Sequence, residues 1–262
     1  DAAGVRLDAS IAWVAPPVDS TRSLSRREGV TGAIEREWMA LADLPGVAGH
    51  EGVVRHAVLA ALPAWARQRA TIDSIGNIVV GMGPARDSVA FIAHMDEVGL
   101  LITDIDSGGM LKFTNVGGFD DRALLGKVVQ IGAGKVMAVI RARAIHLLKR
   151  GEYSKVVKMD AMRIDIGAKS KEAAAGKVKV GDYAAFATEY EELAGGRAAI
   201  GKAFDNRAGC AALIELLRGE RFPFDLIASF TVQEEVGLRG ARVAAFNAKA
   251  DLVIHTSNNR AI

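Results

Sequence analysis

Cysteine, aromatic residues and long apolar runs are all scarce in this chain, and each scarcity excludes a class of protein. The single cysteine, Cys210, leaves no partner for an internal disulfide, and its apolar surroundings are typical of a core residue. Aromatic residues make up only 6% of the 262 residues, too few for the stacking platforms that bind single-stranded nucleic acid. No segment approaches the roughly 20 apolar residues of a membrane-spanning helix.

An excess of charge of one sign is also lacking, since 33 basic and 31 acidic residues leave a formal net charge of +2. Both signs are interspersed, so the sequence predicts neither a nucleic-acid partner nor a membrane surface. The chain begins at Asp1 without a methionine, and residues 1–32 show little periodicity. We predict a cytoplasmic protein, or an exported, periplasmic one if residues 1–32 are a matured N-terminus.

What is present is a change of pattern along the chain. Helical spacing of apolar residues and short apolar runs predict helices and buried strands over residues 33–119, with a hairpin around 107–109. The same patterns return over residues 198–262. Between them, residues 120–197 consist of short β-rich pieces split by glycine. The sequence therefore predicts an α/β domain, preceded by the extension over 1–32 and interrupted by an inserted β-rich domain.

Polar clusters in the α/β parts fall at the ends of predicted elements. His94 and Asp96 follow one apolar strand, and Glu234 and Glu235 follow another. Asp205 lies near the start of a predicted helix. Because open α/β sheets bind ligands beyond the carboxyl ends of their strands, these residues lie where a site is expected.

The residue types in these clusters suit metal-assisted hydrolysis. Imidazole and carboxylate are ligands that zinc, cobalt and manganese accept. Residues i and i+2 of an extended segment point the same way, so Asp96 can orient the ring of His94. Asp205 could bridge two ions, and one of the adjacent Glu234 and Glu235 could stay free as a base. Taken alone, Asp205 is more simply explained as a helix-capping residue, and Glu234 and Glu235 as a solvated pair. Only the combination of these features favours a metal site.

Several stretches of the sequence resemble the tetrahedral (TET) aminopeptidases, a family of co-catalytic metallopeptidases that includes glutamyl and deblocking aminopeptidases. The central motifs are AHMDEVG, GKAFDNRAGC and TVQEEVGLRGA, in this order around the β-rich region. Further family-like segments extend the resemblance over about residues 34–254. The resemblance implies an α/β fold class, a zinc-peptidase-like α/β sandwich with an inserted small β-barrel domain that mediates assembly.

Carried over by motif, the resemblance implies a role for each polar residue. His94 would bind the first metal ion with support from Asp96, and Asp205 would bridge two ions. Glu234 would be the general base, and Glu235 would bind the second ion. The implied function is an aminopeptidase that hydrolyses N-terminal residues of peptides with one or two divalent ions per chain. Zinc is the first choice of ion, with cobalt or manganese as alternatives. The resemblance also implies that copies of the chain assemble into a homo-oligomer, from a dimer up to a tetrahedral dodecamer.

The sequence departs from the family pattern near its end. The family has a further acidic residue on the next strand, but no acid follows Asp251, and Ser257 lies near the expected place. The family also has a late histidine in a C-terminal part that this chain, ending at Ile262, does not reach. We expect that this C-terminal part is missing and that His255 is a candidate second-site metal ligand. The alternative is a strand-end histidine that binds no metal.

Three functional hypotheses are therefore open. The first is the metal-dependent aminopeptidase, favoured by the retention of His94, Asp205 and Glu234. The second is a catalytically impaired relative or fragment that serves as a structural or peptide-binding subunit, favoured by the missing acid. The third is a metal-dependent hydrolase of another amide, because a fold alone does not fix the substrate.

Overall fold

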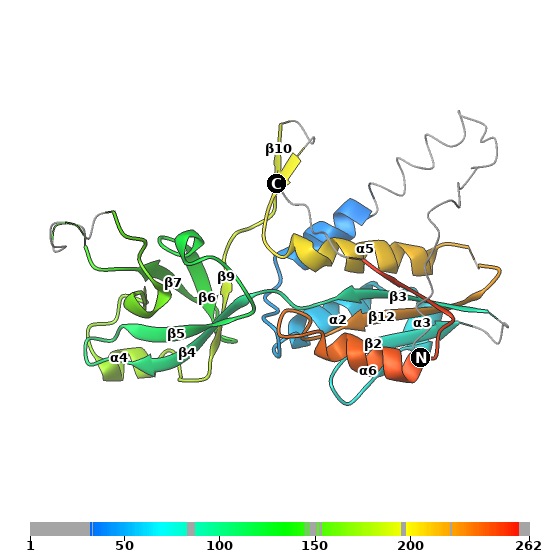
Figure 1. Ribbon diagram of the computed structural model, residues 1–262, viewed down its shortest axis with the longest axis horizontal. Helices are drawn as coiled ribbons and strands as arrows, with labels where there is room; N and C mark the ends of the chain where they lie inside the picture. The colour runs from blue at the N-terminus through cyan, green and yellow to red at the C-terminus, as the bar shows by residue number, and fades with distance from the viewer. Residues whose placement is uncertain are drawn as a thin grey trace, which may run out of the picture.

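The computed structural model describes most of the chain and shows two lobes. The described residues are 32, 34–82, 87–144, 146, 151, 154–194, 198–220 and 222–256. Residues 1–31 of the predicted extension, and Ser257, lie outside them. Figure 1 shows a lobe built on an open sheet with helices on both sides and, next to it, a lobe of short strands. No helix among the described residues has the length and hydropathy needed to cross a membrane.

One lobe is built on a five-stranded mixed sheet in the order β1-β2-β12-β3-β13. The strands are β1 (Thr71–Ile72), β2 (Ile78–Met82), β3 (Ser88–His94), β12 (Asp225–Thr231) and β13 (Leu252–His255). Both β12 and β13 run parallel to β3, whereas β2 pairs antiparallel with β12. Because parallel strands end at the same edge of a sheet, Thr231 of β12 lies in register with His94 of β3. The two strand ends that carry polar clusters are therefore neighbours.

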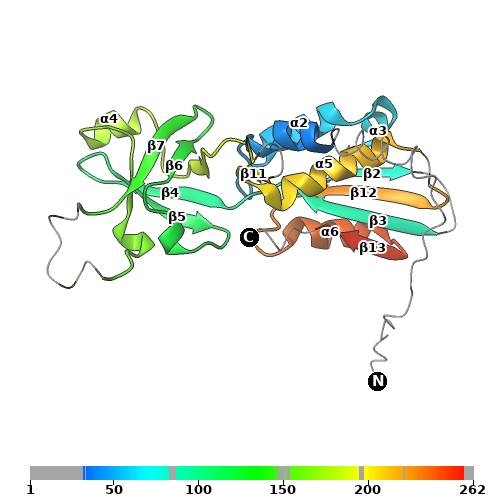
Figure 2. The same cartoon turned by 90° about the horizontal axis from the view of Figure 1, so that it is seen from above.

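Helices cover both faces of this sheet. They are α2 (Gly52–Ala61), α3 (Ala64–Arg69), α5 (Phe204–Arg218) and α6 (Arg239–Ala248), and residues 34–42 are also helical. In α5 the buried residues Cys210, Leu213, Ile214 and Leu217 are spaced i, i+3, i+4 and i+7, so one face is apolar. That face joins α2, α3, β2 and β12 in one core, as predicted for Cys210. Helix α5 lies across β3 and β12 (Figure 2), and α6 covers the opposite face (Figure 1).

The other lobe is a closed barrel in the strand order β4-β5-β8-β7-β6-β9. Its strands are β4 (Gly99–Ile105), β5 (Leu111–Val116), β6 (Val128–Ile131), β7 (Val136–Arg141), β8 (Arg163–Asp165) and β9 (Tyr183–Phe186). Burial alternates along β7, where Ala138 and Ile140 point into the barrel core and Met137 and Val139 point outward. The short helices η1 (Asp121–Ala123), η3 (Met159–Ala161) and α4 (Lys171–Ala175) lie between barrel strands in the chain. Outside the barrel, β10 (Glu191–Leu193) and β11 (Ala198–Ile200) form a separate two-stranded antiparallel sheet.

The barrel lies between β3 and β12 in the chain, so the predicted α/β fold with an inserted small β-barrel is confirmed. The predicted hairpin around 107–109 is confirmed as well, since β4 pairs antiparallel with β5. Both strands of this hairpin belong to the barrel, which therefore begins at Gly99, before residue 120. The division of the chain into domains at residues 120 and 197 stays a prediction.

Candidate active site

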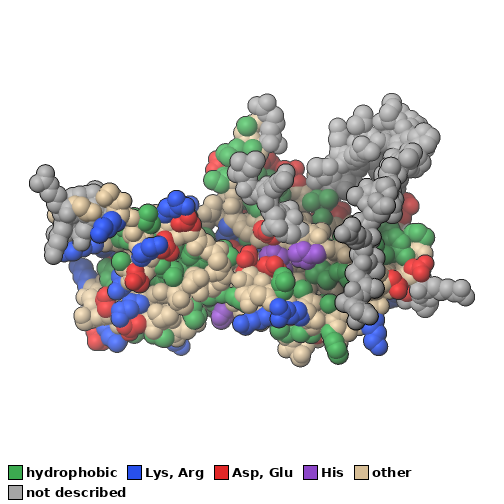
Figure 3. Space-filling model, viewed as in Figure 1, with side chains coloured by type: hydrophobic (Ala, Val, Ile, Leu, Met, Phe, Trp, Pro, Cys, Tyr) green, Lys and Arg blue, Asp and Glu red, His purple; other side chains and the backbone are tan. Residues whose placement is uncertain are grey.

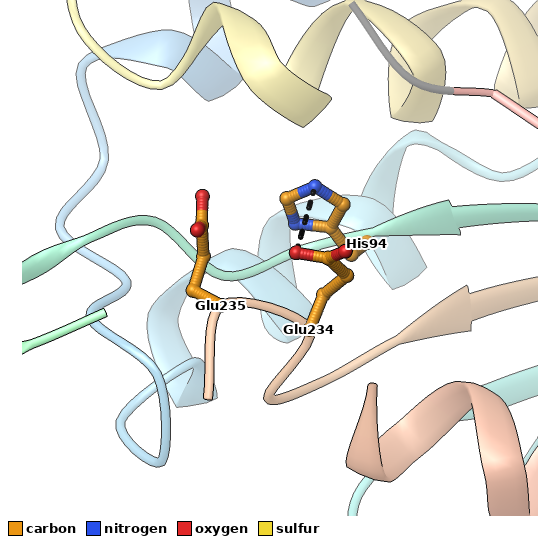
Figure 4. Close-up of side chains that lie close together, drawn as sticks. All are labelled: His94, Glu234 and Glu235. Carbon is orange, nitrogen blue, oxygen red and sulfur yellow. Dashed lines mark ion pairs between the residues drawn. The ribbon is translucent and has the colours of Figure 1, made fainter. Parts of the chain in front are cut away.

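The predicted polar residues of the α/β lobe come together at the carboxyl edge of the sheet. His94 ends β3, and Glu234 and Glu235 follow β12 in a turn. Asp205 lies in the first turn of α5, which packs on β3. Figure 4 shows the carboxylate of Glu234 beside the His94 ring, with Glu235 extending on the same side of the turn. Figure 3 shows the surface of the same view, with acidic side chains and a histidine, none of them labelled, near the middle of the molecule.

The distances among these side chains suit a divalent metal ion. His94 Nε2 lies 3.1 Å from Asp205 Oδ1 and 3.9 Å from Glu234 Oε2. One donor atom each from His94, Glu234 and Glu235 lies within 4.8 Å of the others. Bonds of about 2.1 Å in a tetrahedral zinc site place donor atoms about 3.4 Å apart. Imidazole and carboxylate donors therefore lie close enough together to fit such an ion.

Burial differs sharply across the cluster. The His94 side chain is 2% exposed, whereas the side chains of Glu234 and Asp205 are 24% and 38% exposed. The imidazole is therefore fixed by the interior of the protein, while the carboxylates border the solvent. A ligand can reach the cluster from the carboxylate side without opening the core.

Asp96 is fully buried and contacts both His94 and the turn that carries the two glutamates. His94 Nδ1 lies 3.1 Å from the Asp96 main-chain oxygen and 3.5 Å from its Oδ1. The two carboxylate oxygens of Asp96 accept hydrogen bonds from the main-chain amides of Glu234, at 2.9 Å, and Glu235, at 3.0 Å. The sequence predicted only the contact with His94. The contacts with both glutamates mean that one side chain fixes the imidazole and the neighbouring turn together.

The excess of negative charge shifts the pKa values in the cluster. Burial alone would lower the pKa of His94, but the carboxylates of Asp96, Glu234 and Asp205 outweigh it and raise this pKa. Burial raises the pKa of Glu235 to about 7, an effect that His94 opposes and the neighbouring carboxylates reinforce. A divalent cation among these groups would offset their repulsion and favour the ionised carboxylates.

His255 lies on the edge strand of the same sheet. It pairs with Ile92 of β3, two residues before His94, and its side chain is exposed. Among the residues that the structure describes, the close group of donor atoms does not include His255. Its role as a second-site metal ligand therefore stays a prediction.

Three buried charged residues that the sequence analysis did not single out lie behind the site. Arg207 donates from Nε to the main-chain oxygen of Met95, at 2.8 Å, and from Nη1 to that of Leu41, at 2.6 Å. Glu97 accepts a hydrogen bond from Lys202 Nζ at 2.9 Å. Glu97, Lys202 and Arg207 belong to the same motif stretches as His94 and Asp205, which could have drawn attention to them. They connect the end of β3 with the start of α5.

Fold and site together define an α/β protein with an inserted barrel and a histidine–carboxylate site suited to a divalent metal. The sequence model of the M42 glutamyl aminopeptidase family matches residues 76–257, and the chain belongs to this family. The resemblance to the TET aminopeptidases is therefore confirmed.

Relatives with known names or structures support the assignment. A putative aminopeptidase of Acetivibrio thermocellus is 36% identical over 210 residues, which cover 80% of this chain and 61% of the relative. The crystal structure of a TET aminopeptidase from a marine-sediment thaumarchaeon has a TM-score of 0.79 at 31% identity, covering 86% of this chain and 66% of that one. A Pyrococcus horikoshii TET1 peptidase, described as assembling into a tetrahedron or a large octahedral shell, has a TM-score of 0.78 at 35% identity. The superposition with the Pyrococcus horikoshii peptidase covers 86% of this chain and 68% of the other chain. The chain thus spans about 61% of the length of the curated relative.

Proposed function

We propose that this chain carries the catalytic centre of a metal-dependent aminopeptidase that removes N-terminal residues from peptides. The observation that carries the proposal is the position of His94 Nε2, 3.1 Å from Asp205 Oδ1 and 3.9 Å from Glu234 Oε2. This cluster lies at the sheet edge of a chain that belongs to the M42 family. The surplus of carboxylates also suits the protonated amino group at the start of a peptide.

The proposed roles are those that the resemblance to the TET aminopeptidases implies, and the donor chemistry and exposure of the residues are consistent with them. His94, Asp205 and Glu235 would hold one or two divalent ions, with zinc as the first choice and cobalt or manganese as alternatives. When bound, the metal supplies Lewis-acid chemistry at the scissile carbonyl. Glu234 takes a proton from the attacking water and passes it to the leaving amine. Its partial exposure allows its carboxylate to meet both water and substrate.

The function is tested by metal content and turnover on the purified chain. We expect one to two ions per chain and hydrolysis of aminoacyl-nitroanilides that a chelator abolishes and zinc, cobalt or manganese restores. His94→Ala, which removes the buried nitrogen ligand, is the matched control and is expected to bind less metal and show no turnover. A wild-type chain that binds no metal and hydrolyses nothing would contradict the proposal.

That negative result would favour the second hypothesis, a structural or peptide-binding relative. Two observations support it as the alternative. No acid follows Asp251 in the sequence, and His255 is exposed on an edge strand. Among the described residues, the donor atoms then available for a second ion are those of Asp205 and Glu235.

We also propose that the chain forms homo-oligomers through the barrel. Val128, Met137 and Val139 are 47%, 57% and 38% exposed. Val128 pairs directly with Val139 across β6 and β7, so these side chains share the outer face of the barrel. An apolar face of this kind on a surface is typical of a protein–protein contact. The assembly of the Pyrococcus horikoshii peptidase into a tetrahedron or a large octahedral shell is consistent with such a contact.

The assembly prediction is checked by sedimentation of Met137→Asp. Placing a charge in the apolar face is expected to shift the chain to smaller species while the barrel stays folded. Ile72→Asp alters a residue of similar exposure, 53%, on the other lobe and is expected to leave the assembly unchanged. Wild-type protein that sediments as a monomer, or Met137→Asp protein that assembles like wild type, would contradict the prediction.

A further inference from the structure

Glu51 is a buried carboxylate that reaches the turn carrying Glu234 from a distant part of the chain. It precedes α2, and only 4% of its surface is exposed. Its Oε1 accepts hydrogen bonds from the main-chain amides of Gly49, at 2.7 Å, and Gln233, at 3.1 Å. Gln233 lies 182 positions further along the chain, directly before Glu234. Glu51 therefore links the loop before α2 to the candidate active site.

Gln233 has a strained backbone conformation in this turn. Its φ of +54° lies in the left-handed region, which is unfavourable for a residue with a side chain. Such a conformation persists only where the surroundings fix it. The amide of Gln233 is held by Glu51, and the next two amides, of Glu234 and Glu235, are held by Asp96. Three successive amides are thus bound by two buried carboxylates.

The loop that carries Glu51 is itself attached to the strand extension after His94. The amide of Glu97 donates to the main-chain oxygen of Gly46 at 3.0 Å, and the amide of Ala48 donates to that of Glu97 at 3.2 Å. The loop that carries Glu51 is therefore fixed by main-chain hydrogen bonds to the segment that follows His94. A change at Glu51 would move the Glu234 turn relative to the imidazole rather than move both together.

We propose that Glu51 is a positioning residue for the reaction, which fixes the Gln233 amide and thereby the placement of Glu234 opposite His94. The proposal rests on the proposed function of Glu234. Glu51 acts through a single acceptor oxygen, because Oε1 takes both amides. A neutral amide oxygen at the same place would therefore serve nearly as well as the carboxylate.

The matched pair Glu51→Gln and Glu51→Met tests this inference in the full chain with metal added. Both variants remove the charge before α2 and keep the side-chain length, but only glutamine retains a strong acceptor. Glu51→Met is expected to lower kcat at least about tenfold, because small displacements of reacting groups cost that much or more. Its KM is expected to stay within about twofold, and Glu51→Gln is expected to keep most of the wild-type kcat.

Hydrogen exchange of the metal-free chain gives a readout that does not depend on activity. Glu51→Met is expected to speed exchange of the Gln233 amide, while β12 and the barrel stay protected. Glu51→Asp, which keeps the charge but shortens the reach by one methylene, is expected to behave like Glu51→Met and replaces it if that variant does not fold.

Two outcomes would overturn the inference. Glu51→Met or Glu51→Asp protein with wild-type kcat and wild-type protection at Gln233 would show that the contact positions nothing. An equal loss of kcat in Glu51→Gln and Glu51→Met would show that the charge of Glu51 matters, rather than its role as a hydrogen-bond acceptor. A wild-type chain without peptidase activity would contradict the proposed function, and the exchange comparison would still decide whether Glu51 holds the turn.

Discussion

Replacing Glu234 with glutamine is expected to cause a severe loss of peptide hydrolysis while the metal stays bound. Glutamine keeps the size of the side chain but cannot accept the proton from the attacking water. General acid–base groups contribute roughly 10²–10⁴-fold to rates, so kcat is expected to fall by about that factor. The measurement is kcat on an aminoacyl-nitroanilide together with metal content per chain.

Glu235→Gln is the matched neighbour for this experiment. Its carboxylate is proposed to hold metal, so this change is expected to lower metal content before it affects chemistry. The pKa of Glu235 is raised to about 7 mainly by burial, which makes it the competing candidate for the base. If Glu234→Gln protein keeps its turnover while Glu235→Gln protein binds metal and is inactive, the two roles are exchanged.

Much of the fold follows from local patterns in the sequence. The apolar residues Cys210, Leu213, Ile214 and Leu217 predict α5 because their spacing of i, i+3, i+4 and i+7 places them on one face of a helix. The continuous apolar run of residues 89–93 predicts β3, which is buried between two parallel neighbours. In these elements local periodicity and tertiary burial agree, so sequence alone is sufficient.

The strand pairing of the barrel is a feature that local sequence patterns do not predict. The hairpin of β4 and β5 is visible in the sequence, but its place in the barrel depends on pairing with β9, which sets Leu100 opposite Ala184. No periodicity within either strand encodes a partner more than 80 residues away in sequence. The barrel therefore begins at Gly99 although the texture of the sequence changes only near residue 120.

The candidate site was also predictable from the sequence only in part. The residue types around His94 and Glu234 predict the cluster, because the chemistry needs an imidazole and carboxylates. The register that sets Thr231 beside His94 is a property of the folded sheet. His50 and Glu51 are adjacent in the sequence, yet His50 is exposed with its ring against Tyr183, while Glu51 is buried. Composition cannot tell which of two neighbouring polar residues faces a turn that lies so far along the chain.

Asp96→Asn is expected to have the largest combined effect on stability and metal binding. Asp96 uses both carboxylate oxygens, one for the amide of Glu234 and one for that of Glu235. An asparagine offers one oxygen and one NH₂ group, so a donor would face a donor in a fully buried place. Leaving buried donors unsatisfied costs about 1–3 kcal/mol each, so we expect a loss of roughly 2–4 kcal/mol.

Calorimetry of the metal-free chain separates this effect from metal binding, and Tm is expected to fall by roughly 5–10 °C. Metal affinity, measured by titration, is expected to fall about 10–100-fold, because partners behind a metal ligand contribute that much. Asp106→Asn is the matched control, since a single oxygen of Asp106 accepts the amides of Gly108 and Met110 in the barrel. An asparagine can keep both of those bonds, so its Tm and metal affinity are expected to stay near wild type. Asp96→Asn protein as stable as Asp106→Asn protein would show that the glutamate turn does not depend on two acceptors, and the support of Glu234 would then rest on Glu51 alone.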